Sequence, residues 1–260
     1  MGTAEVQGKL WGRDPQAWAR YQEAQMRPLY DAAFGALEPL AGRALLDAGC
    51  GAGLAVRLAA DRGAVVSGLV ATAPLLEVAR DRTPDADLRV GEIQALPYDD
   101  ASFDVVTAFN SIQYAADPAA AIAQLARVCR PGGTVAIGVW GDPARCETEA
   151  LFARLRSLAP PPPGTPAPLG ISDAGLVESL LEKAGLTVTG GEEVPASFSY
   201  ADHEQAWTAH ASAGPLQKVI DIAGAEAVRQ VMYDVLEADR KADGALRQDN
   251  VFRYVLAAKG

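Results

Sequence analysis

Several features that mark common classes of protein are scarce or missing in this chain of 260 residues. Its three cysteines (Cys50, Cys129 and Cys146) are an odd number without the spacing of a metal site, and it has only two histidines. No run of lysine or arginine forms a basic stripe, and the formal net charge is −10. No apolar run is long enough to span a membrane, and residues 1–15 lack the apolar core of a signal peptide. We therefore expect a cytoplasmic protein with free thiols, no bound metal, and neither nucleic acid nor a membrane as its partner.

The most informative stretch is Ala44-Leu-Leu-Asp-Ala-Gly-Cys-Gly-Ala-Gly53. Its first half is short and apolar, as in a buried strand of a parallel sheet, and residues 54–62 then have the composition of a helix. The glycines between them allow a sharp turn and the close approach of a ligand. The N-terminus of the following helix offers N–H groups to an anionic group such as a carboxylate or phosphate. This pattern predicts a site for a nucleotide-type cofactor.

The spacing of the glycines distinguishes between the possible cofactors. A dinucleotide fingerprint would need a glycine where Leu54 stands, and a P-loop would need a Gly-Lys-Ser/Thr ending. The stretch from Leu46 to Gly53 instead resembles the first motif of class I S-adenosylmethionine-dependent methyltransferases, in particular the small-molecule enzymes of the ubiquinone/menaquinone-biosynthesis type. The resemblance implies that Asp47 helps to position the methionine end of the cofactor and that the glycines pass beneath its amino-acid portion.

Other features follow in the order typical of that family. A strand pattern over 102–109 is followed by Asn110 and Gln113, and an amphipathic helix over 118–129 leads to a turn at 130–133 and a strand over 134–140. The resemblance implies an α/β, doubly wound, mostly parallel seven-stranded sheet of the Rossmann-like methyltransferase fold. The expected strand order is 3-2-1-4-5-7-6, with the last strand antiparallel.

We expect one domain over residues 1–260. Aromatic residues at helical spacing over 15–34 predict an N-terminal helical cover within residues 1–40. Residues 41–145 would form the cofactor-binding core. The C-terminal half, 146–260, would contain a helical insertion at about 201–246, before the last strand, which could act as a lid.

The cofactor-binding residues follow from the family resemblance. Glu92, after the third strand, would accept a hydrogen bond from the adenine amino group, with Ile93 beside the ring. The full set is Asp47, Gly49, Cys50, Gly51, Gly53, Val70, Ala71, Thr72, Glu92, Ile93, Asn110 and Gln113.

Val70 departs from the family pattern. The family normally ends its second strand with an acid that accepts hydrogen bonds from both ribose hydroxyls, and Val70 stands at that position. The hydroxyl of Thr72 could replace one of these bonds at most. Two hypotheses follow. The first is a methyltransferase acting on a small organic acceptor, for example in secondary metabolism. The second is a methyltransferase fold repurposed for non-methylating chemistry, such as a cyclase or isomerase, or for binding.

Candidates for the acceptor site are fewer. An aromatic pocket could be lined by Trp11, Tyr21, Trp140 and Tyr200. The alternative for each of them is an ordinary place in the hydrophobic core. His210 is the candidate catalytic base, needed only if the acceptor must lose a proton; the alternative is a lid histidine without catalytic duty. The acceptor and the oligomeric state cannot be read from the sequence.

Overall fold

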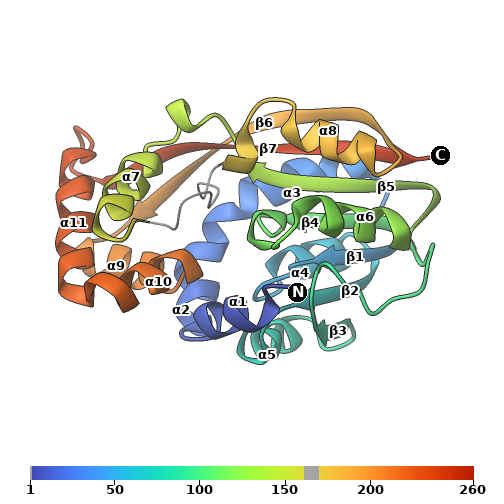
Figure 1. The fold of residues 1–260 in the computed structure, drawn as a ribbon, viewed down its shortest axis with the longest axis horizontal. Helices are drawn as coiled ribbons and strands as arrows, with labels where there is room; N and C mark the ends of the chain where they lie inside the picture. Colours follow the sequence, from blue (N-terminus) through green and yellow to red (C-terminus); the bar gives the residue numbers. More distant parts are fainter. Residues whose placement is uncertain (1, 161–169) are drawn as a thin grey trace.

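A computed structural model describes residues 2–160 and 170–260 and contains a seven-stranded sheet with the order β3-β2-β1-β4-β5-β7-β6 (Figure 1). The strands are β1 (Ala44–Ala48), β2 (Val65–Val70), β3 (Asp87–Val90), β4 (Phe103–Phe109), β5 (Cys129–Trp140), β6 (Leu186–Tyr200) and β7 (Leu246–Lys259). Only the pairs that involve β7 are antiparallel. The predicted fold class and strand order are confirmed.

Eleven α-helices accompany the sheet within the described residues. They are α1 (Ala4–Trp11), α2 (Pro15–Ala17), α3 (Arg27–Leu37), α4 (Leu54–Asp61), α5 (Ala73–Arg82), α6 (Pro118–Val128), α7 (Thr148–Leu158), α8 (Leu176–Lys183), α9 (His203–Ala211), α10 (Gly214–Ala223) and α11 (Ala225–Ala238). None of the helices in the described part of the chain is long and apolar enough to cross a membrane.

Strand β1 lies at the centre of the parallel part, paired with β2 on one side and β4 on the other. Because successive side chains of a strand point to opposite faces, its two leucines belong to different cores. Leu45 packs with α3, α4 and α5, whereas Leu46 packs with α6 and α8. Burial on both faces explains why this segment is a continuous apolar run.

Strands β6 and β7 form a ribbon that is longer than the rest of the sheet. Pairing between them runs from Leu186–Lys259 to Tyr200–Leu246, whereas β5 pairs with β7 only as far as Trp140–Phe252. The remainder of the ribbon projects beyond the sheet, and α9, α10 and α11 gather at its far end (Figure 1). This is the predicted helical insertion before the last strand.

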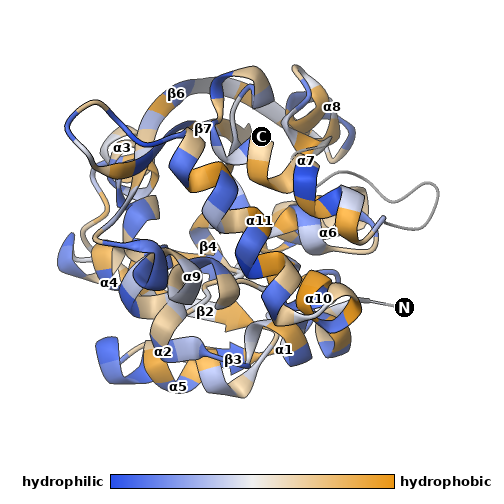
Figure 2. Cartoon of the chain, turned by 90° about the vertical axis from the view of Figure 1, so that its left-hand side faces the viewer, coloured by the Kyte–Doolittle hydropathy of each residue, from blue (hydrophilic) through white to orange (hydrophobic). Residues whose placement is uncertain are grey.

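The helices of the insertion are amphipathic. Figure 2, which views the molecule from this end, shows hydrophilic and hydrophobic bands on α9, α10 and α11. The buried residues of α11 are Val228, Met232, Val235 and Leu236, which recur at helical spacing along one face. The insertion therefore packs on the rest of the molecule through its own apolar stripe.

The N-terminal segment is helical but interrupted. The sequence predicts one helix over 15–34, whereas α2 gives way to a π-helical turn at Trp18–Gln22 and a 3-10 turn at Glu23–Met26 before α3 begins. π-helical turns insert an extra residue per turn and are frequent at functional sites. The interruption turns Trp18, Gln22 and Glu23 toward the ends of the central strands.

One element boundary differs from the prediction. The expected turn at 130–133 lies inside β5, which begins at Cys129. Gly132 has a φ of 76°, and the pairing of β5 with β4 shifts register between Phe103 and Val105. An irregular strand end therefore replaces the separate turn.

Candidate functional site

A cavity of about 180 Å³ lies at the carboxyl ends of β1, β2 and β4. Ligands of open α/β sheets bind at this edge because the connecting loops diverge there. The N-terminal segment covers one side of the cavity, and α9 and α10 of the insertion contribute to another. The cavity is thus built from segments far apart in the sequence.

The glycine turn after β1 forms the floor. Gly49 has a φ of 97°, and a Cβ at this position would lie 2.2 Å from the Cβ of Ser111. The Ser111 hydroxyl donates a hydrogen bond to the carbonyl of Ala48 at 2.7 Å. Both the backbone angle and the approach of Ser111 therefore require glycine at position 49.

The N-terminus of α4 is already partnered. Glu23 Oε1 accepts hydrogen bonds from the backbone N–H groups of Ala52 at 3.0 Å and Leu54 at 3.4 Å, and the other carboxylate oxygen pairs with Arg82. From the sequence, this helix end is expected to receive an anionic group of the cofactor. Glu23 occupies that position instead, and its role could not be read from the sequence.

Asp47 is buried at the end of β1 and accepts a hydrogen bond from the Thr107 hydroxyl at 2.8 Å. The parallel register of β1 and β4 places these two residues opposite each other. Burial raises the pKa of Asp47 to about 7, with a further increase from the Glu23 charge, although the bond from Thr107 lowers it. Two buried carboxyl groups make this part of the cavity suited to a cationic ligand.

Val70 lies at the end of β2, lines the cavity and is 6% exposed. Helix α1 passes directly over the next residues: a Cβ on Gly8 would lie 2.6 Å from the Ala71 carbonyl oxygen, and one on Gly12 would lie 2.7 Å from Thr72 Oγ1. The cover therefore packs on the segment after β2, where the family acid is missing.

Glu92 and Ile93 line the same region, after β3. Glu92 already accepts hydrogen bonds from the backbone N–H of Ala4 at 2.8 Å and that of Gln94 at 3.1 Å. A carboxylate has about four acceptor positions, so both oxygens keep capacity for a further donor. Glu92 thus holds the start of α1 as well as facing the cavity.

Two polar atoms of the cavity lining are buried and have no hydrogen-bond partner among the described residues. They are the indole Nε1 of Trp18 and the Oδ1 of Asn110. Asn110 also has a φ of 47°, a left-handed conformation that is uncommon outside glycine. An unpaired buried polar atom costs free energy, so such atoms at a cavity indicate groups that a ligand would satisfy.

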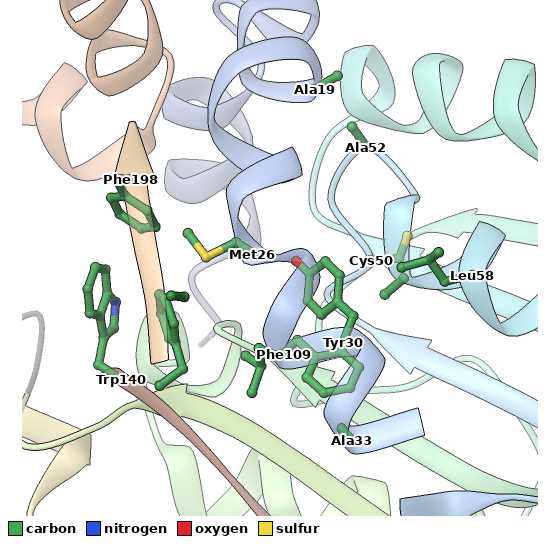
Figure 3. Packing of buried hydrophobic residues seen from close by; sticks show 14 of the residues in the cluster. Ala19, Met26, Tyr30, Ala33, Cys50, Ala52, Leu58, Phe109, Trp140 and Phe198 are labelled. Atoms are coloured by element: carbon green, nitrogen blue, oxygen red, sulfur yellow. The ribbon is translucent and has the colours of Figure 1, made fainter. Parts of the chain in front are cut away.

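The far part of the cavity is aromatic. Trp140 packs edge-on against Phe152 and Phe198, with ring centroids 6.0 Å and 5.7 Å away. In Figure 3, Met26 and Tyr30 of the N-terminal segment lie between the rings of Trp140 and Phe198 on one side and Cys50 of the glycine turn on the other. The lining is therefore continuous from the turn to the aromatic wall.

His210 of α9 lines the cavity and is buried. The Tyr200 hydroxyl lies 2.9 Å from His210 Nε2 and 3.3 Å from Gln22 Oε1. Since an amide oxygen only accepts, both contacts are satisfied when Tyr200 donates to Gln22 and His210 Nε2–H donates to Tyr200. The other ring nitrogen, Nδ1, is then unprotonated. Burial lowers the pKa of His210 to about 4, which keeps the ring neutral.

Most residues predicted from the sequence line this cavity. They are Asp47, Gly49, Cys50, Gly51, Val70, Ala71, Thr72, Glu92, Ile93, Asn110, Trp11, Trp140 and His210. The predictions did not include Trp18, Gln22, Glu23, Met26 and Tyr30 of the cover, which also line it. Their only sequence signal is the aromatic spacing of the N-terminal segment.

Four predicted residues do not line the cavity: Gly53, Gln113, Tyr21 and Tyr200. Gly53 serves helix packing, because a Cβ there would lie 2.7 Å from the Cβ of Ala79. Tyr21 packs on the core near Arg20, and Tyr200 lies behind His210. After β4, Tyr114 lines the cavity rather than its neighbour at 113.

These features fit S-adenosylmethionine, which carries a sulfonium, an ammonium and a carboxylate. The glycine turn leaves room for its chain, the buried carboxyl groups would face its positive charges, and the unpaired polar atoms would be available to its polar groups. Residues 46–137 match the model of a methyltransferase domain. The match runs from within β1 to within β5 and includes the glycine turn.

Two relatives of this chain are methyltransferases that match it beyond the methyltransferase domain. The chain is 34% identical over 207 residues to the 27-O-demethylrifamycin SV methyltransferase of Amycolatopsis mediterranei, covering 74% of this chain and 73% of that protein. It is 32% identical over 155 residues to the ubiquinone biosynthesis O-methyltransferase of Paracidovorax citrulli, covering 55% of this chain and 65% of that protein. The chain belongs to the class I S-adenosylmethionine-dependent methyltransferases that act on small molecules.

Solved structures show the same fold. The [4+2]-cyclase SpnF matches with a TM-score of 0.58 at 22% identity, over 89% of this chain and 80% of that one. A geranyl diphosphate C-methyltransferase from Streptomyces coelicolor A3(2) matches with a TM-score of 0.54 at 15% identity, over 89% and 75%. At these identities the likeness establishes the fold, which hosts more than one chemistry.

Proposed function

We propose that this protein transfers a methyl group from S-adenosylmethionine to an oxygen atom of a small, largely apolar organic acceptor. The observation that carries the proposal is the continuous cavity, which joins the glycine turn to the wall formed by Trp140, Phe152 and Phe198. His210 lies in the lining of the same cavity and offers a polar group for the acceptor. A relative that aligns with 74% of the chain at 34% identity is named for the methylation of an oxygen.

The cofactor would occupy the part of the cavity beside β1 and β2. Asp47 and Glu23 would face its positive groups, and Ile93 would pack against the adenine with Glu92 nearby. When bound, S-adenosylmethionine supplies a methyl group activated by the positive charge on sulfur. The protein's contribution is then alignment, because methyl transfer is an in-line displacement that depends mainly on the positions of donor and acceptor.

His210 would orient the acceptor hydroxyl. The hydrogen-bond chain through Tyr200 to Gln22 leaves Nδ1 available to accept a proton or a hydrogen bond. A pKa of about 4 makes this nitrogen a weak base in the resting protein, so its main service is to fix the hydroxyl oxygen toward the methyl group. Positive charge that develops on the acceptor oxygen would favour proton transfer to His210.

The aromatic wall of Trp140, Phe152 and Phe198 indicates which class of acceptor would fit the cavity. Three aromatic rings present apolar surface and flat faces, which suit a ring system or a hydrocarbon chain more than a sugar or a peptide. The acidic net charge of −10 disfavours a nucleic acid. We place this activity in one domain over residues 1–260 and in the cytoplasm.

The proposal is tested by incubating the chain with S-adenosylmethionine carrying a labelled methyl group and a panel of hydroxylated aromatic and isoprenoid compounds. Label on a product oxygen, found by mass spectrometry, supports the proposal. The alternative, a non-methylating cyclase or isomerase, is motivated by Val70. It would be favoured if an acceptor changes its connectivity without gaining a methyl group, while no S-adenosylhomocysteine forms.

A further inference from the structure

We propose that Trp18 and Glu23 of the N-terminal cover together bind the zwitterionic amino-acid end of the cofactor. The indole N–H of Trp18 donates a hydrogen bond to the carboxylate of the cofactor, and the side chain of Glu23 accepts one from its ammonium group. This inference deepens the proposed function, since it assigns two residues of the cover to the same cofactor site. Neither residue belongs to the part of the chain that matches the methyltransferase domain.

The end of helix α4 cannot serve the carboxylate. Glu23 Oε1 already accepts from the N–H groups of Ala52 and Leu54, so a second carboxylate there would meet a like charge. Arg82 pairs with Glu23 and donates to the carbonyls of Ala52 and Ala19, so both of its terminal nitrogens already have partners. The carboxylate of a ligand above the glycine turn therefore needs another donor.

Trp18 provides such a donor. Its Nε1 is buried, has no hydrogen-bond partner among the described residues and belongs to the cavity lining. The ring is fixed by an edge-on contact with Trp11, with centroids 4.7 Å apart at an interplanar angle of 82°. An indole N–H can only donate, so its natural partner is an acceptor such as a carboxylate oxygen.

The two groups flank one small volume above the glycine turn. From the position that a Cβ on Gly51 would occupy, Glu23 Oε1 lies at 3.3 Å and Trp18 Nε1 at 3.5 Å. An acceptor with negative charge and a neutral donor thus stand close together, next to a residue whose lack of a side chain leaves the space open. This arrangement complements an ammonium and a carboxylate on the same carbon.

The π-helical turn explains how both residues reach the site. Residues five apart in an α-helix are offset by more than one turn, whereas the wider turn at Trp18–Gln22 brings Trp18 and Glu23 onto one side. The backbone N–H of Glu23 bonds to the carbonyl of Trp18, which closes this turn. The role of the π-helical turn is therefore to place Trp18 and Glu23 on the side of the cover that faces the cavity.

The test compares two ligands by titration calorimetry with the full chain: S-adenosylhomocysteine and 5′-methylthioadenosine, which lacks the amino-acid end. We expect Trp18→Phe to weaken S-adenosylhomocysteine by about tenfold or more, because one hydrogen bond to a charged group is lost. Binding of 5′-methylthioadenosine should be unchanged. Trp207→Phe is the matched control, since Trp207 does not line the cavity and should leave both affinities unchanged.

A decarboxylated analogue of S-adenosylhomocysteine separates the two roles. Trp18→Phe should not affect its binding, whereas Glu23→Gln should weaken it, with the melting temperature recorded to verify that the variant is folded. Equal losses for both nucleosides, or no loss for either, in Trp18→Phe would overturn the inference while leaving the proposed function intact. If the unsubstituted chain binds neither nucleoside, the proposed function fails as well.

Discussion

The buried carboxyl group of Asp47 gives the sharpest prediction about stability. Its pKa is raised from 3.8 to about 7, mainly by burial. Replacement by asparagine keeps the shape and the contact with Thr107 but removes the ionisable group. We expect Asp47→Asn to be more stable than the natural protein at pH 8, and close to it at pH 4.

The sign and size follow from proton linkage. Between pH 4 and pH 7 the folded chain holds a proton on Asp47 that the unfolded chain has released, so the free energy of unfolding falls as pH rises through this window. A pKa displaced from 3.8 to about 7 corresponds to about 4 kcal/mol, fully expressed above pH 7. For a chain of this size, that is about 10 °C in melting temperature.

Urea unfolding followed by circular dichroism at several pH values between 4.5 and 8.5 would measure the difference. Asp104→Asn is a control of opposite sign. Partial burial raises the pKa of Asp104, but hydrogen bonds from the Ala44 N–H and Arg130 outweigh it and hold the pKa below 3.8. That variant should lose stability at neutral pH. A gain in Asp47→Asn that does not depend on pH, or a loss at pH 8, would refute the linkage argument.

Three further predictions concern the cavity. Val70→Asp should tighten S-adenosylhomocysteine about tenfold in calorimetry, since a carboxylate regains a charged hydrogen bond to the ribose; weaker binding would refute the ribose assignment. His210→Gln should lower kcat more than it raises KM, and an unchanged kcat would exclude the orienting role. The natural chain should lose stability as pH falls from 6.5 to about 4, because the imidazole takes up a proton in the unfolded chain before it does so in the folded one. His210→Gln should remove this loss. Gly214→Ala places a Cβ 2.5 Å from Trp11 Nε1, so the cover should close poorly and nucleoside affinity should fall, while an unchanged affinity would show that α1 and α10 need not meet.

The sheet could be predicted from the sequence because its determinants are local and ordered. The apolar run ending at Asp47, the glycines after it and the later strand patterns each fix one element, and the family resemblance fixes their order. The residues at strand ends were then predictable as a group, since parallel strands of one sheet end at the same edge.

The contribution of the cover could not be predicted in the same way. Glu23 looks like an exposed helix residue in the sequence, yet its side chain is 3% exposed because the segment docks on the start of α4. The π-helical turn that places it has no sequence signature, and its partner Arg82 is distant along the chain. Likewise, the pair formed by Tyr200 and His210 depends on how α9 leaves the ribbon.

The β6–β7 ribbon has a consequence for how this protein can diversify. Tyr200 and Leu246 are paired across the ribbon, so the chain departs into the insertion and returns from it at a single point. A shorter or different segment between these two residues could be joined there by a tight turn, with every strand of the sheet retained. His210 and the parts of α9 and α10 that line the cavity belong to this exchangeable segment, whereas Asp47 and the glycine turn do not. The geometry therefore allows one side of the cavity to change by replacement of a single module, while the glycine turn and the aromatic wall of Trp140, Phe152 and Phe198 are retained.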